Sequence, residues 1–146
     1  YKHVLAVVLY ELERFNAELE PHMATTEREL YPLIDRLDAG KDNDEVRAQF
    51  QQLRVTLEAE HVEAGLTLQI LRSATNRYEV PAQACGTLRS LYQGLKELEQ
   101  LMQLHVHLEN NVLFPRAARC CRWFDHHERT FGGDGGAGGA KPPGEL

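Results

Sequence analysis

The sequence predicts an all-α protein, built as an antiparallel, up-and-down helical bundle. Leucine, valine and phenylalanine recur at alternating steps of three and four residues, the spacing of the buried face of an amphipathic helix. Glycine and proline interrupt the chain in few places, and no stretch alternates apolar and polar residues as a strand does. Long helices with short connections pack as antiparallel neighbours.

The first helix is expected over residues 2–37. Its apolar stripe begins at Leu5 and ends at Leu33. Pro21 and Pro32 lie inside this stretch, and because proline has no backbone N–H they should bend or stop the helix locally.

Two further long helices follow, so three are expected in all. Residues 38–44 have the composition of a turn and lead into a helix over residues 44–73. A second break at residues 76–81 precedes a helix over residues 82–113, which has the most regular leucine stripe of the three.

One helical domain is expected over residues 1–118, with an extension of uncertain structure over residues 119–146. Residues 116–131 are compatible with a short amphipathic extension. Residues 132–146 contain seven glycines and too little apolar surface to offset the entropy of ordering, so they are expected to be disordered.

Composition excludes several classes of function. The chain has 16 lysines and arginines against 22 aspartates and glutamates, a net charge of −6, so no nucleic-acid partner is expected. No apolar run approaches the roughly 18 to 20 residues of a membrane span. Three cysteines in no framework spacing, and no visible signal peptide, favour the cytoplasm.

Two segments of the chain repeat one local pattern. His22 and His105 each begin a segment that ends ten residues later in a Leu-aromatic-Pro sequence, at Pro32 and Pro115. Both histidines and both prolines are 83 residues apart. Such a repeat indicates pseudo-twofold symmetry around the middle of a bundle.

Each predicted helix places a histidine on its apolar stripe. These are His22, His61 and His105, and the third is followed four residues later on the same face by Glu109. A buried carboxylate without a partner is very costly, and a buried imidazole needs its hydrogen bonds met. A metal ion meets both demands, since imidazole and carboxylate are ligands for iron, zinc or manganese. The alternative is a set of hydrogen-bonded core histidines.

The remaining histidines and the cysteines have no firm assignment to a site. His3 and His107 are expected to face solvent, whereas the uncertain extension contains His126 and His127. The role of the thiols is open for Cys85, Cys120 and Cys121.

Four segments resemble the hemerythrin-like domain of the iron–sulfur-cluster-repair di-iron proteins. They are HVHLENNVLFP at 105–115, EHVEAG at 60–65, PAQACGTLRSLY at 81–92, and PHM at 21–23 with LYP at 30–32. The resemblance covers about residues 5–118. It implies a four-helix bundle around two iron ions bridged by carboxylates, with an oxo bridge as an option. It also implies a cytoplasmic role in restoring iron–sulfur clusters damaged by oxidative or nitrosative stress.

The resemblance implies roles for particular residues. His22, His61 and His105 match iron-binding histidines, and Glu109 matches a bridging carboxylate. Where the family has a second bridging glutamate, this chain has Thr26.

Two glutamates close to Thr26 are candidates for the second bridge. Glu27 is favoured, although it lies about 100° further round the helix, because the helix could rearrange near its prolines. Glu29 is the other candidate. The family's first ligand helix would precede Tyr1. The chain would then borrow that helix from a partner, have lost it, or be a degenerate member that binds iron weakly.

The leading hypothesis is therefore a di-iron, non-haem protein that acts on damaged iron–sulfur proteins, with dioxygen or nitric oxide as small ligands and without ordinary enzymatic turnover. One alternative is a metal-free or degenerate helical interaction module that forms a homodimer through an exposed apolar seam. Another is a hemerythrin-like carrier or sensor of dioxygen or nitric oxide.

Overall fold

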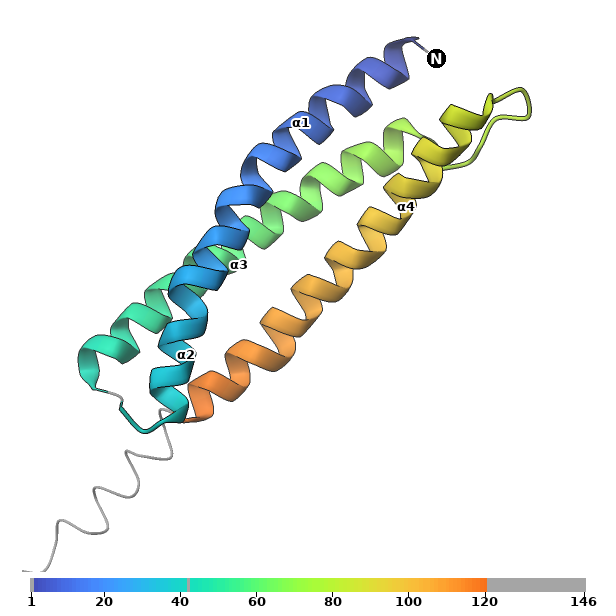
Figure 1. Cartoon of the computed structure of the whole chain (residues 1–146). Coiled ribbons are helices and arrows are strands. Elements are labelled where there is room, and N and C mark those ends of the chain that lie inside the picture. Colours follow the sequence, from blue (N-terminus) through green and yellow to red (C-terminus); the bar gives the residue numbers. More distant parts are fainter. Residues whose placement is uncertain (1, 42, 121–146) are drawn as a thin grey trace, which may run out of the picture.

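The structure is a computed structural model that describes residues 2–41 and 43–120 (Figure 1). Within these ranges every regular element is helical and none is a strand. The helices form three long antiparallel rods, which confirms the predicted all-α, antiparallel bundle. The expectations for residues 121–146, including the glycine-rich segment, lie outside the described residues.

The first rod is one continuous helical path from residue 2 to residue 38. It consists of α1 (Lys2–Thr25), the π-helical segment η1 (Thr26–Leu30) and α2 (Tyr31–Asp38). Pro21 lies inside α1 without ending it, and Pro32 falls in the first turn of α2, where its missing N–H costs little. The ribbon changes direction between α1 and α2 (Figure 1), so the prolines accompany a bend and do not stop the helix.

The second rod is α3 (Asp44–Ala74). The Asn43 side chain caps its start, since Oδ1 accepts a hydrogen bond of 2.9 Å from the backbone N–H of Val46. The third rod contains α4 (Gly86–His107) and a second π-helical segment, η2 (Leu108–Leu113).

The boundaries of the third rod differ from the prediction at both ends. The rod starts four residues after the predicted position 82 because residues 81–84 close a turn, in which the Ala84 N–H donates to the carbonyl of Pro81. Helical residues continue past position 113 to position 120.

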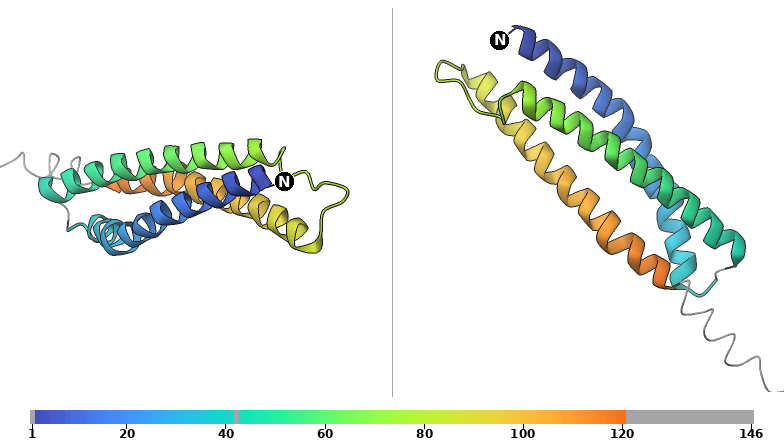
Figure 2. Two further views of the ribbon diagram at one scale, coloured as in Figure 1. Left: turned by 90° about the horizontal axis from the view of Figure 1, so that it is seen from above. Right: turned by 180° about the vertical axis from the view of Figure 1, so that it is seen from behind.

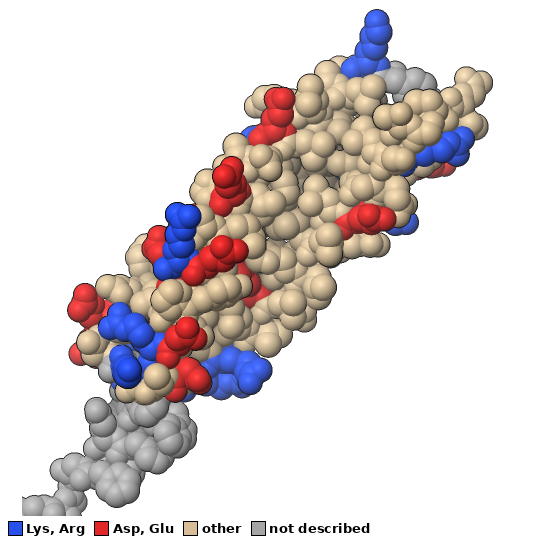
Figure 3. Space-filling model, in the orientation of Figure 1, with Lys and Arg blue, Asp and Glu red and all other residues tan. Residues whose placement is uncertain are grey.

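The three rods run down, up and down in succession (Figures 1 and 2). The most extensive packing joins α1 to α3, and α3 also contacts α4. Short connections make neighbouring rods antiparallel. On the face drawn in Figure 3, acidic and basic side chains gather toward the end of the bundle that carries α2. No helix in the described part of the chain has the length and apolarity needed to cross a membrane.

Two separate apolar clusters hold the rods together. The first cluster contains Val8, Phe15, Leu68, Leu71, Tyr78, Leu95 and Met102. The second contains Leu30, Leu37, Val46, Phe50, Leu57, Phe114 and Ala117. Along every rod the change from one cluster to the other occurs at the level of a histidine, so a polar layer divides the core.

Phe50 tests the contribution of the second cluster, because its side chain is fully buried and packs edge-to-face against Phe114, with ring centroids 6.5 Å apart. With metal removed by chelator, Phe50→Ala should lower the free energy of unfolding by about 3–5 kcal/mol. Urea unfolding followed by far-ultraviolet circular dichroism measures this change. The control Leu101→Ala removes a side chain that is 65% exposed and should change the free energy of unfolding by less than about 0.5 kcal/mol. Similar losses in both variants would contradict the place of Phe50 in the buried core.

Candidate metal centre

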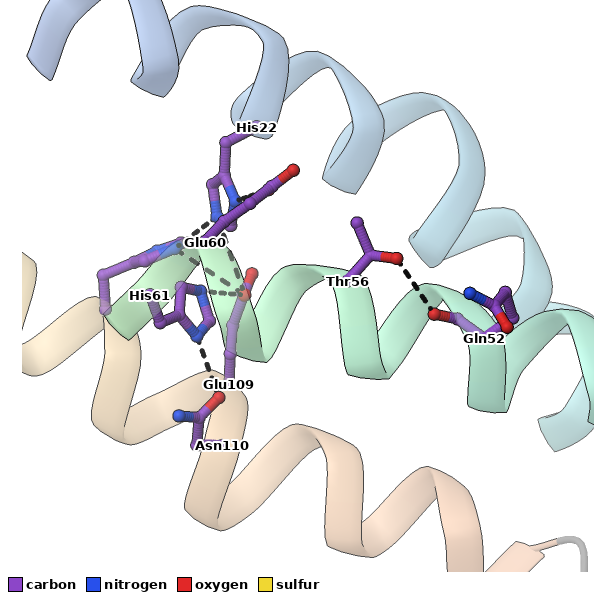
Figure 4. Close-up of polar contacts among 8 residues, drawn as sticks. His22, Gln52, Thr56, Glu60, His61, Glu109 and Asn110 are labelled. Atoms are coloured by element: carbon purple, nitrogen blue, oxygen red, sulfur yellow. Dashed lines mark hydrogen bonds and ion pairs between the residues drawn. The ribbon is translucent and has the colours of Figure 1, made fainter. Parts of the chain in front are cut away.

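The polar layer brings together one side chain from each of four helical segments. His22 comes from α1, His61 from α3, His105 from α4 and Glu109 from η2. Their ligand atoms all lie within 4.8 Å of one another. Figure 4 shows the rings of His22 and His61 and the carboxylate of Glu109 converging between the rods. We call these four residues the His–Glu cluster.

The imidazole Nε2 atoms form the centre of the cluster. Nε2 of His22 lies 3.2 Å from Nε2 of His105 and 3.9 Å from Oε2 of Glu109. The same carboxylate oxygen lies 3.1 Å from Nε2 of His61 and 3.7 Å from Nε2 of His105. All three rings therefore present the same nitrogen to one shared point.

Several polar atoms of the cluster are buried without a hydrogen bond. His22 and His61 are each 5% exposed and Glu109 is 4% exposed. Nε2 of His61 and both carboxylate oxygens of Glu109 make no hydrogen bond despite their closeness. Orphaned buried acceptors of this kind are expensive. A cation bound between them would satisfy them, so the donor set fits a transition-metal ion.

Two neighbouring side chains orient two of the three imidazoles, those of His22 and His61. Oε2 of Glu60 lies 2.7 Å from Nδ1 of His22, and Oδ1 of Asn110 lies 2.9 Å from Nδ1 of His61 (Figure 4). Both oxygens can accept a hydrogen bond from Nδ1–H, and the tautomer with its hydrogen on Nδ1 leaves the Nε2 lone pair free toward the centre. Metal-binding histidines are oriented by partners of this type.

The electrostatics of the cluster favour an anionic carboxylate. Burial alone would raise the pKa of Glu109, but the three imidazoles outweigh it and hold the pKa below its usual value. Burial by itself lowers the pKa of His61, yet the oxygens of Glu109 and Asn110 raise it overall. Burial lowers the pKa of His105, and His22 and His61 add to this against the attraction of Glu109. The site therefore holds negative charge where a cation would bind.

The two repeated segments adopt the same local structure. Each histidine of the repeat is followed by a π-helical segment, η1 after His22 and η2 after His105. Such segments are rare and occur often at functional sites. Adding 83 to 26 gives 109, so Thr26 occupies the position equivalent to Glu109. Thr26 is fully buried, and its hydroxyl makes no hydrogen bond.

Four of the five residues predicted as metal ligands belong to the cluster, and the fifth does not. Glu27 is exposed, because it lies one residue beyond the buried face of the rod and the helix continues there without turning it inward. Glu29 is exposed as well. In the described part of the chain, neither candidate for the second bridging carboxylate lies at the site.

The remaining histidines and thiols within the described residues lie apart from the cluster. His3 and His107 are exposed, as expected. Cys85 is exposed and Cys120 is half-buried, and both are free thiols. The expectations for His126, His127 and Cys121 concern residues outside the described ranges.

Sequence reasoning did not find the two orienting residues. Glu60 contacts a histidine on another helix, and Asn110 contacts His61 from η2, so neither pairing follows from spacing within one stripe. The one sequence feature that points to them is adjacency to predicted ligands, since Glu60 directly precedes His61 and Asn110 directly follows Glu109.

A cavity of about 520 Å³ between α1 and α3 reaches the cluster at His22 and His61. Its walls are mostly apolar and include Phe15, Leu19 and Met102. The cavity therefore gives one side of the cluster an apolar approach.

Comparison with known families agrees with this geometry. Residues 2–117 match the model of the hemerythrin HHE cation binding domain. The chain belongs to the hemerythrin family. The matched span includes every residue of the His–Glu cluster.

Curated relatives of this hemerythrin domain share a name that describes a function. The chain is 36% identical over 109 residues to a probable iron-sulfur cluster repair protein of Haemophilus influenzae, covering 75% of this chain and 45% of that protein. It is 37% identical over 107 residues to the iron-sulfur cluster repair protein YtfE of Edwardsiella ictaluri, covering 73% of this chain and 45% of the relative. The match to YtfE of Cronobacter sakazakii is 38% over 106 residues, covering 73% and 44%. The hemerythrin domain thus aligns with less than half the length of these relatives.

Glu60 provides a test of how the imidazoles are oriented. Glu60→Ala removes the acceptor from Nδ1 of His22 and should weaken metal affinity about 10–100-fold, as measured by competition with a chromogenic chelator. The control Glu58→Ala removes a carboxylate of the same helix that is paired with Arg54, and should leave the affinity unchanged. Equal affinities in both variants would show that Glu60 does not orient the ligand.

Proposed function

We propose that this hemerythrin domain binds iron through the His–Glu cluster and takes part in repairing damaged iron–sulfur clusters. The observation that carries the proposal is the convergence of three Nε2 atoms and one buried carboxylate on a common point. The names of the relatives support the repair role. We place the protein in the cytoplasm, where its client iron–sulfur proteins would be encountered after oxidative or nitrosative stress.

In this proposal each residue of the cluster has a defined task. The three histidines are terminal imidazole ligands, and Glu109 supplies the anionic ligand. Glu60 and Asn110 hold protons on Nδ1, and the apolar clusters on either side exclude water. Bound iron would supply redox chemistry and an open position for a small ligand.

The number of ions depends on the carboxylates. A pair of bridged irons, as the family resemblance implies, would call for a second buried carboxylate beside Glu109. The residue expected in that role, Glu27, is exposed.

The apolar cavity favours small uncharged ligands. Dioxygen and nitric oxide are weakly polar, so a space lined by Phe15, Leu19 and Met102 admits them without the cost of removing a hydration shell. Binding of either gas fits the proposed repair role and is equally the basis of a carrier or sensor.

A second candidate function is a metal-free interaction module. Its support is the set of exposed apolar side chains on α1, α4 and η2, namely Leu5, Leu9, Leu101, Leu104, Leu108 and Val112. The four on the third rod, from α4 into η2, recur at steps of three and four, so they form one stripe. An apolar stripe of this type can pair with another helix or with a second copy of the chain.

Repair of a client cluster tests the main proposal. Purified iron-loaded protein should restore the activity of a [4Fe–4S] dehydratase inactivated by nitric oxide, measured against the unrepaired enzyme. The His105→Ala/Glu109→Ala double variant should retain little iron and restore no activity. As a control, His107→Ala alters an exposed histidine of the same helix and should behave as the unmodified protein. Equal iron content in the double variant and the unmodified protein would reject the site.

Thermal unfolding separates the two candidate functions. If metal binds the folded chain, removing it with a chelator should lower the melting temperature by about 5–10 °C, the shift expected when free metal exceeds Kd about 100-fold. The double variant should show no shift. A dimer whose melting temperature depends on protein concentration and not on chelator would favour the interaction module.

A further inference from the structure

We propose that the His–Glu cluster holds a single metal ion, not a bridged pair, and that Thr26 is the residue that sets this number. The inference rests on the proposed metal-binding function. It concerns how many ions the site accepts, which neither the family match nor the names of the relatives specify.

Most of the distances within the cluster are near those of a single ion's shell. Four ligand atoms about 2.1 Å from a tetrahedral ion lie about 3.4 Å from one another. Four of the six distances between the Nε2 and Oε2 atoms, 3.1, 3.2, 3.7 and 3.9 Å, are distributed around this value. All four atoms lie within 4.8 Å of one another, so the ligands form one group that would close slightly around a single ion.

The internal repeat shows what a second bridging ligand would need. In the second copy, Glu109 follows His105 by four residues, and its carboxylate reaches the centre. In the first copy, Thr26 follows His22 by the same four residues and starts the equivalent π-helical segment. The threonine hydroxyl ends two bonds closer to the backbone than a glutamate carboxylate does. The pseudo-symmetric position thus carries a short neutral group where a second bridge would have to begin.

Charge balance favours one ion for the same reason. Within the described ranges, Glu109 is the one carboxylate in the cluster. One divalent ion beside one carboxylate leaves a net charge of about +1, whereas two ions would leave about +3 in a buried layer between apolar clusters. Glu60 does not change this, because its carboxylate is paired with Nδ1 of His22 and its side chain is 45% exposed.

The full chain, stripped of metal, can be titrated with Co²⁺ and, without oxygen, with Fe²⁺. The proposal predicts one equivalent of either ion per chain. After oxidation, the iron-loaded chain should give the electron paramagnetic resonance signal of an isolated high-spin ferric ion, integrating to about one centre per iron. Two equivalents with a spin-coupled, silent ferric pair would overturn the proposal while leaving iron binding intact. No binding of either ion would reject the proposed function itself.

Two variants test the role of Thr26. Thr26→Val keeps the shape and removes the hydroxyl, so it should still bind one equivalent of Co²⁺; loss of binding would show that Thr26 is itself needed at the site. Thr26→Glu restores a carboxylate at the pseudo-symmetric position and should raise the capacity toward two. A folded Thr26→Glu protein that still binds one equivalent would overturn the role given to Thr26. If Thr26→Glu fails to fold, the titrations of the unmodified chain and of Thr26→Val still decide whether the site binds one ion or two.

Discussion

The structure depends on the cost of placing two buried imidazoles, a half-buried imidazole and a buried carboxylate in the middle of an apolar core. Isolated, such groups would oppose folding, because His61 and Glu109 leave orphaned acceptor atoms there. They are tolerable together because their lone pairs face one point that a cation can occupy. The two apolar clusters on either side fix the rods in place, so the polar layer is held in a geometry that it would not adopt alone.

The packing of the helices brings these polar residues together as one site. The three rods pack with short connections, so a histidine near mid-length on each arrives at the same level. The π-helical segments follow the two repeated histidines and give the bundle an approximate internal symmetry. That symmetry is broken at one pair of positions, Glu109 and Thr26, and the chemistry of the site follows from this difference. Glu60 and Asn110 complete the layer by fixing ring orientation.

The fold could be predicted from the sequence because helical periodicity is a local property, and the stripes of leucine specify three rods closely. The grouping of His22, His61, His105 and Glu109 could be anticipated for the same reason, since each sits on a buried stripe. Glu27 was harder to place from the sequence, because its role as a ligand assumes a rearrangement near Pro21 and Pro32, and in the structure it lies exposed on the π-helical segment η1. The contacts of Glu60 and Asn110 with the imidazoles could not be predicted from the sequence, because they cross between helices.

The most direct test of the central claim is anomalous X-ray diffraction from crystals of the iron-loaded protein, recorded at the iron absorption edge. We expect an anomalous peak within about 2.0–2.2 Å of Nε2 of His22, His61 and His105 and of a Glu109 oxygen. Iron located elsewhere, or imidazoles whose Nε2 atoms are satisfied by ordinary hydrogen bonds with no peak between them, would contradict it.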